Sequence, residues 1–201
     1  MRLTDLPFQA MGPQPPFAAS DLERFVAAPR IAILSYVKRD GTPAQAPIWY
    51  QYRDGRFAMV TAKTSPKAKA LARAGRACLT IQDEIPPYRA VIVDGDVTLT
   101  DVAVEGGINS WLAMHYFGRI GGREYEKMTA EENRKTGLSL ITFDPVRVRG
   151  FDNHRLIGRA LRLYMRLREA LPVPRSCPGS PTSCRIPLQL GRPTSALRYS
   201  S

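Results

Sequence analysis

The residue types best suited to bind a phosphate group stand close together where a predicted strand passes into a predicted helix. They are the hydroxyl and lysine side chains of Thr61, Lys63, Thr64, Ser65, Lys67 and Lys69. Free N–H groups at a helix start, the positive end of the helix dipole, and nearby lysine and hydroxyl groups all favour a bound phosphate. This stretch therefore predicts a site for a phosphate-bearing ligand. The alternative interpretation is a solvated helix face with Ser65 as its cap.

The sequence contains no common catalytic motif: it has no G-x-S-x-G motif, no Walker loop and no H-E-x-x-H. The two histidines, His115 and His154, have no evident acid-base partner, and we interpret both as structural. The three cysteines match neither a disulfide framework nor the paired spacing of a zinc site. We therefore assign no catalytic residue and no metal ligand. The cysteine usage fits a reducing compartment, and we expect a cytoplasmic protein.

Turn residues divide the first part of the chain into short strands. The segments 31–39, 43–53 and 56–62 alternate in polarity and are joined at Asp40-Gly41 and Asp54-Gly55, which are strong hairpin signals. The sequence therefore predicts an antiparallel meander of three strands.

Two helices flank this meander. Ser20 followed by Glu23 is typical of a capping box, and Pro29 is expected to end that first helix. A second helix is predicted over 67–74, with Ser65 as its N-cap.

The remaining elements are two strands, two helical stretches and two last strands, over 77–83, 88–100, 108–117, 123–133, 138–143 and 146–151. Gly95 predicts a bulge or bend, and Asp144-Pro145 predicts a break between the last two strands. Six or seven antiparallel strands predict a small closed barrel, because closure removes exposed edges. The fold class is thus mainly β with helices, α+β. Tight hairpins argue against a doubly wound parallel sheet.

Composition and charge limit the partners of the chain. Its 201 residues include 44% hydrophobic and 23% charged residues, and the net charge is +11. No run approaches the roughly 18 apolar residues needed to cross a bilayer, so no transmembrane segment is expected. Residues 156–201 hold eight Arg, no Lys and one acidic residue, which accounts for +7 of the net charge. Because the rest of the chain is only mildly basic, we expect no specific nucleic-acid partner.

Several short motifs follow one another between residues 29 and 100. They are a Pro-Arg entry to the first strand, a D-G-x-P turn, a Pro-Ile-Trp-Tyr strand, the T-x5-K element of Thr61 to Lys67, and P-Y-R-x-V-x-V-x-G at Pro87 to Gly95. Their order resembles the pyridoxamine 5'-phosphate oxidase-like superfamily, and more narrowly its flavin/deazaflavin oxidoreductase branch. The resemblance spans most of residues 20–152. It implies an antiparallel split β-barrel of the FMN-binding type.

The resemblance also implies a cofactor site. Thr61 and Lys67 match residues that contact the flavin phosphate, and Ser65 and Lys69 stand beside them. The strand segment Pro47, Ile48 and Trp49 matches backbone that lies along the isoalloxazine ring. An ordinary half-buried strand would show the same alternation of side chains in this segment.

Two departures from the oxidase pattern affect the expected activity. Pro66 stands where the oxidase has a basic residue, and Ala90 stands where it has a flavin-contacting glutamine. Both departures weaken the case for pyridoxamine oxidase activity. They favour the deazaflavin coenzyme F-420 slightly over FMN, and both cofactors remain candidates.

The predicted organisation has three parts. Residues 1–19 form an N-terminal extension, residues 20–155 the split-barrel cofactor-binding domain, and residues 156–201 an Arg/Pro/Ser-rich tail. Leucines at helical spacing predict one short amphipathic helix early in the tail. Arginine without lysine beside Pro, Ser and Cys is also what a shifted reading frame in a GC-rich gene produces.

These observations predict an oxidoreductase in which a bound deazaflavin coenzyme or FMN exchanges hydride with a small-molecule substrate. Because the cofactor supplies the chemistry, the protein mainly binds and orients, which explains the lack of a visible acid-base pair. The resemblance implies a homodimer. The alternative is a non-catalytic split-barrel module that binds a cofactor or haem, or that binds a polyanion through its tail.

Overall fold

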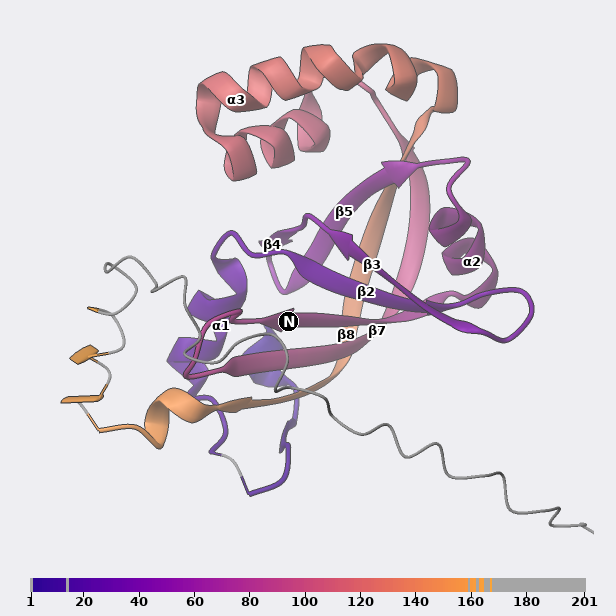
Figure 1. Cartoon of the computed structure of the whole chain (residues 1–201). Helices are drawn as coiled ribbons and strands as arrows, with labels where there is room; N and C mark the ends of the chain where they lie inside the picture. The colour runs from indigo at the N-terminus through magenta and orange to yellow at the C-terminus, as the bar shows by residue number, and fades with distance from the viewer. Residues whose placement is uncertain (1, 14, 159, 162, 165–166, 168–201) are drawn as a thin grey trace, which may run out of the picture. The chain divides into compact units, whose positions relative to one another are not determined.

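A single sheet of eight strands forms the body of the chain in the computed structural model (Figure 1). Seven strands follow the order β3-β2-β6-β7-β8-β5-β4 with antiparallel pairing, and β1 pairs with β8 in parallel. The structure describes residues 2–13, 15–158, 160–161, 163–164 and 167. Most of the predicted tail and much of its amphipathic helix lie outside these residues.

The bounds of the strands are β1 Phe8–Ala10, β2 Ala32–Val37, β3 Pro43–Ile48, β4 Gln51–Arg53, β5 Arg56–Ala62, β6 Arg76–Gln82, β7 Arg89–Val102 and β8 Leu138–Asp152. Both predicted hairpins are confirmed, since β2 pairs with β3 across Asp40-Gly41 and β4 pairs with β5 across Asp54-Gly55. Asp54 and Gly55 have φ values of 52° and 78°. Positive φ at both central residues is what a tight type I′ hairpin requires.

The closed barrel predicted from the sequence is wrong, because the sheet is open. The predicted strand 43–53 is interrupted at Trp49-Tyr50, so that β3 pairs only with β2 and β4 pairs only with β5. The two ends of the sheet, β3 and β4, do not pair with each other in the described chain. The α+β class with antiparallel strands is confirmed. Because of this interruption, no ladder of hydrogen bonds joins β3 to β5. The candidate site lies in the gap between these two strands.

Within residues 2–158, the described part of the chain has three α-helices, α1 Ala19–Ala27, α2 Pro66–Ala74 and α3 Gly107–Thr136, with short 3-10 turns at Leu3–Asp5 and Asn153–Arg155. Figure 1 shows α3 as two arms that fold back on each other above the sheet. The break between the arms is Gly118, with φ 73° and ψ 174°. The two separate helical stretches predicted here are thus confirmed. None of the described helices is long and apolar enough to span a membrane.

The start of α1 differs from the prediction. The helix begins at Ala19 after Ala18, and no side chain caps it. Glu23 makes tertiary contacts instead of a capping box. It accepts hydrogen bonds from the Tyr52 hydroxyl at 2.7 Å and from the backbone N–H of Thr4 at 3.3 Å. The end of α1 before Pro29 agrees with the prediction.

The long strands β7 and β8 run together through a bulge. Asp94 pairs with Arg147, whereas Gly95 pairs with Pro145, so Val146 is an extra residue on β8. This shift in register confirms the bulge predicted at Gly95. Only glycine fits at this position, because a Cβ there would overlap the Phe143 ring and the Asp144 carbonyl oxygen. The predicted break at Asp144-Pro145 is wrong. The bulge accommodates a residue without an N–H, so the strand continues.

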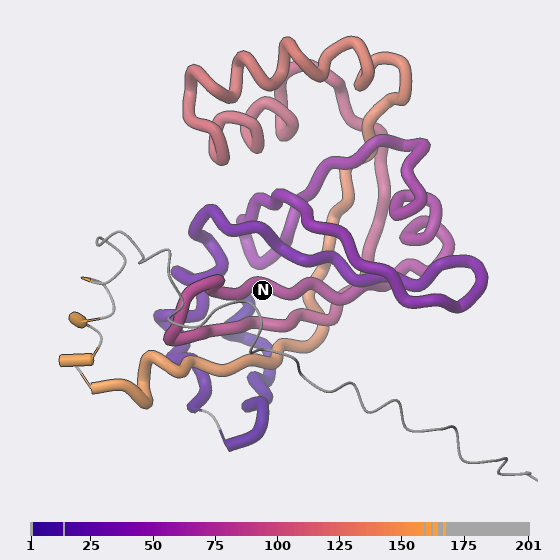
Figure 2. Tube along the Cα trace, in the orientation of Figure 1, coloured from indigo at the N-terminus to yellow at the C-terminus, as the bar shows by residue number. Residues whose placement is uncertain are grey.

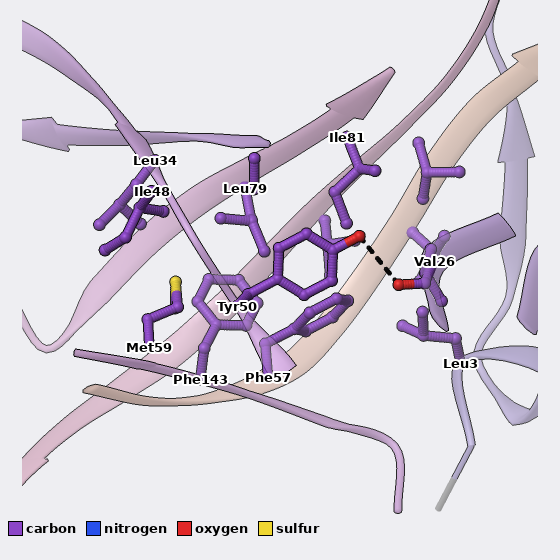
Figure 3. Close-up of a cluster of buried hydrophobic side chains, with 14 of the residues drawn as sticks. Leu3, Val26, Leu34, Ile48, Tyr50, Phe57, Met59, Leu79, Ile81 and Phe143 are labelled. Atoms are coloured by element: carbon purple, nitrogen blue, oxygen red, sulfur yellow. Dashed lines mark hydrogen bonds between the residues drawn. The ribbon is translucent and has the colours of Figure 1, made fainter. Parts of the chain in front are cut away.

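The hydrophobic core lies inside the curved sheet (Figure 3). Phe57 and Phe143 meet edge to face, with ring centroids 5.9 Å apart. Tyr50 is buried beside them, and its hydroxyl donates a 2.8 Å hydrogen bond to the carbonyl oxygen of Val26. Burial raises the pKa of Tyr50 far above its usual value. The core therefore joins α1 to the strands that flank the gap.

The N-terminal segment belongs to the same compact unit as the sheet. Leu3 and Phe17 are buried in the core, and β1 adds a parallel strand beside β8. Figure 2 shows this indigo segment next to the orange end of β8. Described residues of the predicted extension 1–19 therefore pack in the core and pair with the sheet.

Asp83 anchors a charged cluster beside α1. It pairs with Arg30 at 3.2 Å and with Arg89 at 2.6 Å, and both guanidinium groups lie over the ring of Phe25. His154 lies 3.8 Å from the same carboxylate. Partial burial, together with the positive charge of Arg89, lowers the pKa of His154 below its usual value of 6.5.

We expect acid to destabilise the fold through His154. Because its pKa is lower in the folded chain, the unfolded chain binds more protons near pH 6.5, and stability falls as the pH drops from about 6.5 through the folded pKa. Urea unfolding across this range measures the slope, and His154→Gln should flatten it. An equally steep slope in the variant would assign the effect to other groups.

Candidate functional site

A cleft of about 620 Å³ lies in the gap between β3 and β5. One wall comes from the end of β3 and from the residue before β2. The other comes from β5 and from the start of α2. The residues on these two walls are Ile31, Pro47, Ile48, Trp49, Val60, Thr61, Ala62, Ser65 and Lys67.

The two arms of α3 cover the cleft. The first arm contributes Asn109 and Leu112, and the second contributes Tyr125 and Asn133. Leu138, the first residue of β8, completes the lining. The surface is thus largely apolar, with two amides and one phenol on the side of α3.

Hydroxyl groups gather at the end of the cleft where β5 passes into α2. The Thr61 and Ser65 hydroxyls are 3.2 Å apart and share a hydrogen bond. Ser65 also accepts a 3.2 Å hydrogen bond from the backbone N–H of Ala68, as an N-cap does. Pro66 follows as the first helical residue, and Gly75 ends the helix with φ 64°. The predicted strand end, cap and helix are therefore confirmed as local structure.

Lys67 is the only charged residue among those that line the cleft. Its side chain is half-buried, and burial lowers its pKa. It forms no ion pair with a described residue, whereas nearby Lys63 pairs with Asp101 at 2.6 Å. A half-buried ammonium without a counter-charge, beside two hydroxyls and the positive end of a helix, favours an anionic group.

The structure brings six of the seven predicted cofactor residues together. Pro47, Ile48, Trp49, Thr61, Ser65 and Lys67 all line the cleft. Lys69 is exposed on α2 and is not among the lining residues. Their role as cofactor ligands stays a prediction, but the common location was expected from the sequence.

Aromatic side chains hold α3 against the end of β3. The Trp49 ring stacks on Tyr116 with centroids 5.2 Å apart and planes 14° apart. It also meets the rings of Phe117 and Tyr125, each at 5.1 Å. These contacts place one edge of the cleft directly against both arms of α3.

The sequence interpretation missed the residues that α3 contributes. The predicted site residues did not include Asn109, Leu112, Tyr125 or Asn133, although all four line the cleft. A signal was available, because Tyr125 and Asn133 are eight positions apart and therefore share one helix face.

Tyr116 fixes the first arm of α3 to the strands. Its hydroxyl accepts a 3.2 Å hydrogen bond from the N–H of Tyr50 and donates one of 2.7 Å to the carbonyl oxygen of Arg30. We expect Tyr116→Phe to cost about 1–2 kcal/mol of stability and to speed hydrogen exchange at the Tyr50 amide. Tyr36→Phe is the matched control, and equal exchange rates in the two variants would contradict the role of Tyr116.

Among the described residues, no group of three His, Cys, Asp or Glu side chains is placed to hold a metal ion. Cys78 pairs with Asp94 across β6 and β7, and burial raises its pKa to about 11. The thiol is therefore protonated near neutral pH and unsuited to act as a nucleophile.

Comparison with solved structures shows a common fold. An F420 reductase matches with a TM-score of 0.53 and 19% sequence identity, over 63% of this chain and 94% of that one. A conserved hypothetical protein from Mycobacterium tuberculosis matches with a TM-score of 0.56 and 18% identity, over 87% of this chain and 99% of that one. At these identities the likeness concerns the fold alone. No curated protein matches the chain.

The family comparison covers seven of the eight strands, β2 to β8, together with the cleft and α3. Residues 19–152 match the family model described as Pyridoxamine 5'-phosphate oxidase. This match includes every residue that lines the cleft. The chain therefore belongs to the pyridoxamine 5'-phosphate oxidase-like family, with its split-barrel fold.

Proposed function

We propose that this chain is an oxidoreductase that binds a deazaflavin coenzyme or FMN in the cleft between β3 and β5. The observation that carries the proposal is Lys67, a half-buried ammonium at the start of α2 that has no ion-pair partner among the described residues and lines a cleft of about 620 Å³. When bound, either cofactor would supply hydride transfer to or from a small substrate.

The residues present fit such a cofactor by their chemistry. Lys67, Thr61 and Ser65 offer a positive charge and hydroxyl donors for a phosphate group. Pro47, Ile48 and Trp49 offer strand backbone and an apolar surface for a planar ring. A phosphate at Lys67 would raise the pKa that burial has lowered, so the ammonium would stay charged when the cofactor is bound.

The chain's contribution to the reaction would be to orient and to exclude water. The side chains of Ile48, Leu112 and Leu138 give the cleft an apolar surface, and residues of both arms of α3 line it. Two planar partners held face to face under such a cover need no acid-base pair from the protein. The homodimer expected for this family is part of the proposal, and the sedimentation velocity of the full chain measures it.

The non-catalytic alternatives receive less support from the cleft. Haem is usually held by His, Cys, Met or Tyr. Of these, the described lining offers only Tyr125. A barrel that stores haem would therefore depend on that single phenol.

Stopped-flow absorbance tests the proposal. The protein is loaded with chemically reduced FMN or reduced deazaflavin coenzyme and mixed with a panel of quinone, nitro and enone acceptors. We expect reoxidation faster than that of the free cofactor for at least one acceptor under anaerobic conditions. Binding without any acceleration over the free cofactor would favour the non-catalytic alternative.

A further inference from the structure

The bend of α3 exposes an unusual group of side chains, which we call the α3 tip: Phe117, Arg119, Ile120 and Arg123. Ile120 is 83% exposed and Phe117 is 51% exposed. Both arginines are also exposed, and neither forms an ion pair with a described residue. Elsewhere on the second arm, Lys127 pairs with Glu124 and Lys135 pairs with Glu131.

The backbone holds this tip firmly in place. Gly118 turns the chain with a positive φ, and Gly122 lets the second arm approach the first closely. A Cβ on Gly122 would lie 2.7 Å from the backbone of Met114. The two arms are also joined by a hydrogen bond between the Ser110 hydroxyl and the Glu126 carboxylate. The tip is thus a defined surface rather than a frayed helix end.

We propose that the α3 tip docks on an anionic lipid surface. Large apolar side chains beside unpaired arginines suit the boundary between headgroups and acyl chains, where apolar groups insert and guanidinium groups meet lipid phosphates. A second copy of the chain fits less well, because a two-fold contact between identical tips brings four positive charges together. Charge complementarity therefore selects the anionic lipid surface.

One residue of the tip, Phe117, contacts aromatic residues that line the cleft. The Phe117 ring is 5.1 Å from Trp49 and 5.2 Å from Tyr125, and both of these line the cleft. Docking would therefore bring the cleft close to the bilayer surface. The consequence that an apolar substrate enters from lipid rests on the proposed function, whereas docking itself does not.

Vesicle co-sedimentation of the full chain tests the charges. The vesicles contain phosphatidylcholine alone or an equimolar mixture with phosphatidylglycerol. We expect the double variant Arg119→Glu, Arg123→Glu to lower the partition onto the anionic vesicles by at least about 30-fold. The matched control is Lys38→Glu, Arg39→Glu, which reverses two exposed charges in the turn between β2 and β3. The arginine-rich residues 156–201 are present in every variant, so partition through them is the same in the tip variant and in the control.

Quenching by lipids brominated on the acyl chain tests the apolar contact. We expect Ile120→Trp to add fluorescence that these lipids quench. Met128→Trp is the matched control, because Met128 is 75% exposed on the same arm but outside the tip. Equal losses of partition in the two charge variants, or equal quenching at the two tryptophans, would overturn the proposal. Tip variants that bind vesicles normally but lose self-association would instead assign the tip to a second copy.

Neither readout depends on a bound cofactor. If cofactor binding fails while the tip docks, only the proposed function is wrong. If the cofactor binds and the tip variants partition like the native chain, only the docking proposal is wrong.

Discussion

Replacing Lys67 with alanine is expected to weaken binding of the phosphate-bearing cofactor by about tenfold to a hundredfold, because a hydrogen bond to a charged group contributes roughly 1.5–3 kcal/mol. The effect is expected to be specific to this lysine, since no other described residue of the cleft lining is charged. Equilibrium dialysis gives the dissociation constants of FMN and of the deazaflavin coenzyme for the native protein and for the variant.

Lys69→Ala is the matched control for this experiment. Lys69 lies two positions further along the same helix, but it is exposed and lies outside the lining. Its loss is expected to change the affinity little, because an exposed charge acts through water and salt. Equal losses of affinity in the two variants would mean that the general charge of α2, rather than the placement of Lys67, attracts the cofactor.

The largest expected loss of stability follows from Ile81→Ala. The Ile81 side chain is fully buried on β6, within the core that supports both walls of the cleft. Removing it should cost about 2–5 kcal/mol of unfolding free energy, since the lost burial is accompanied by a cavity. Urea unfolding monitored by circular dichroism measures the difference.

Ile85→Ala provides the matched control for stability. Ile85 is the same residue type four positions later, and it is 55% exposed in the loop after β6. We expect a change within about 0.5 kcal/mol, as for most exposed substitutions. A loss at Ile85 as large as that at Ile81 would show that the loop, rather than the core, limits the stability of the barrel.

Local signals in the sequence were sufficient for most of the elements. The turns at Asp40-Gly41 and Asp54-Gly55 need positive φ, and such turns are recognisable from the residue types alone. The cap at Ser65 and the bulge at Gly95 are similarly local. The capping box at Ser20 failed because Glu23 bonds to distant residues, which no local pattern reveals.

The opening of the barrel depends on contacts that the sequence does not encode locally. The predicted strand 43–53 alternates without interruption, yet it divides at Trp49-Tyr50. The Tyr116 hydroxyl accepts a hydrogen bond from the backbone N–H of Tyr50, and the Trp49 ring packs on α3. At these two residues, contacts with α3 therefore replace hydrogen bonds to a neighbouring strand. The contribution of α3 to the site was missed for the same reason.

The candidate site was predictable on its strand side and not on its helix side. Thr61, Ser65 and Lys67 combine a strand end, a cap and a charge within one short segment, so their types and spacing indicated the site directly. Tyr125 and Asn133 reach the cleft only because Gly118 folds α3 back over the sheet. The sequence indicated a break between two helical stretches, but the direction in which the second arm folds back is set by the assembled fold.

One thermodynamic cycle tests the central claim most directly. The dissociation constants of FMN and of riboflavin, which lacks the phosphate, are measured for the native protein and for Lys67→Ala, and the deazaflavin coenzyme is compared with its dephosphorylated chromophore in the same way. If the phosphate lies at Lys67, FMN or the deazaflavin coenzyme should bind native protein at least about tenfold more tightly than its phosphate-free counterpart, and the variant should lose most of this advantage. An advantage that is absent in the native protein, or equally large in the variant, would contradict a phosphate site at Lys67.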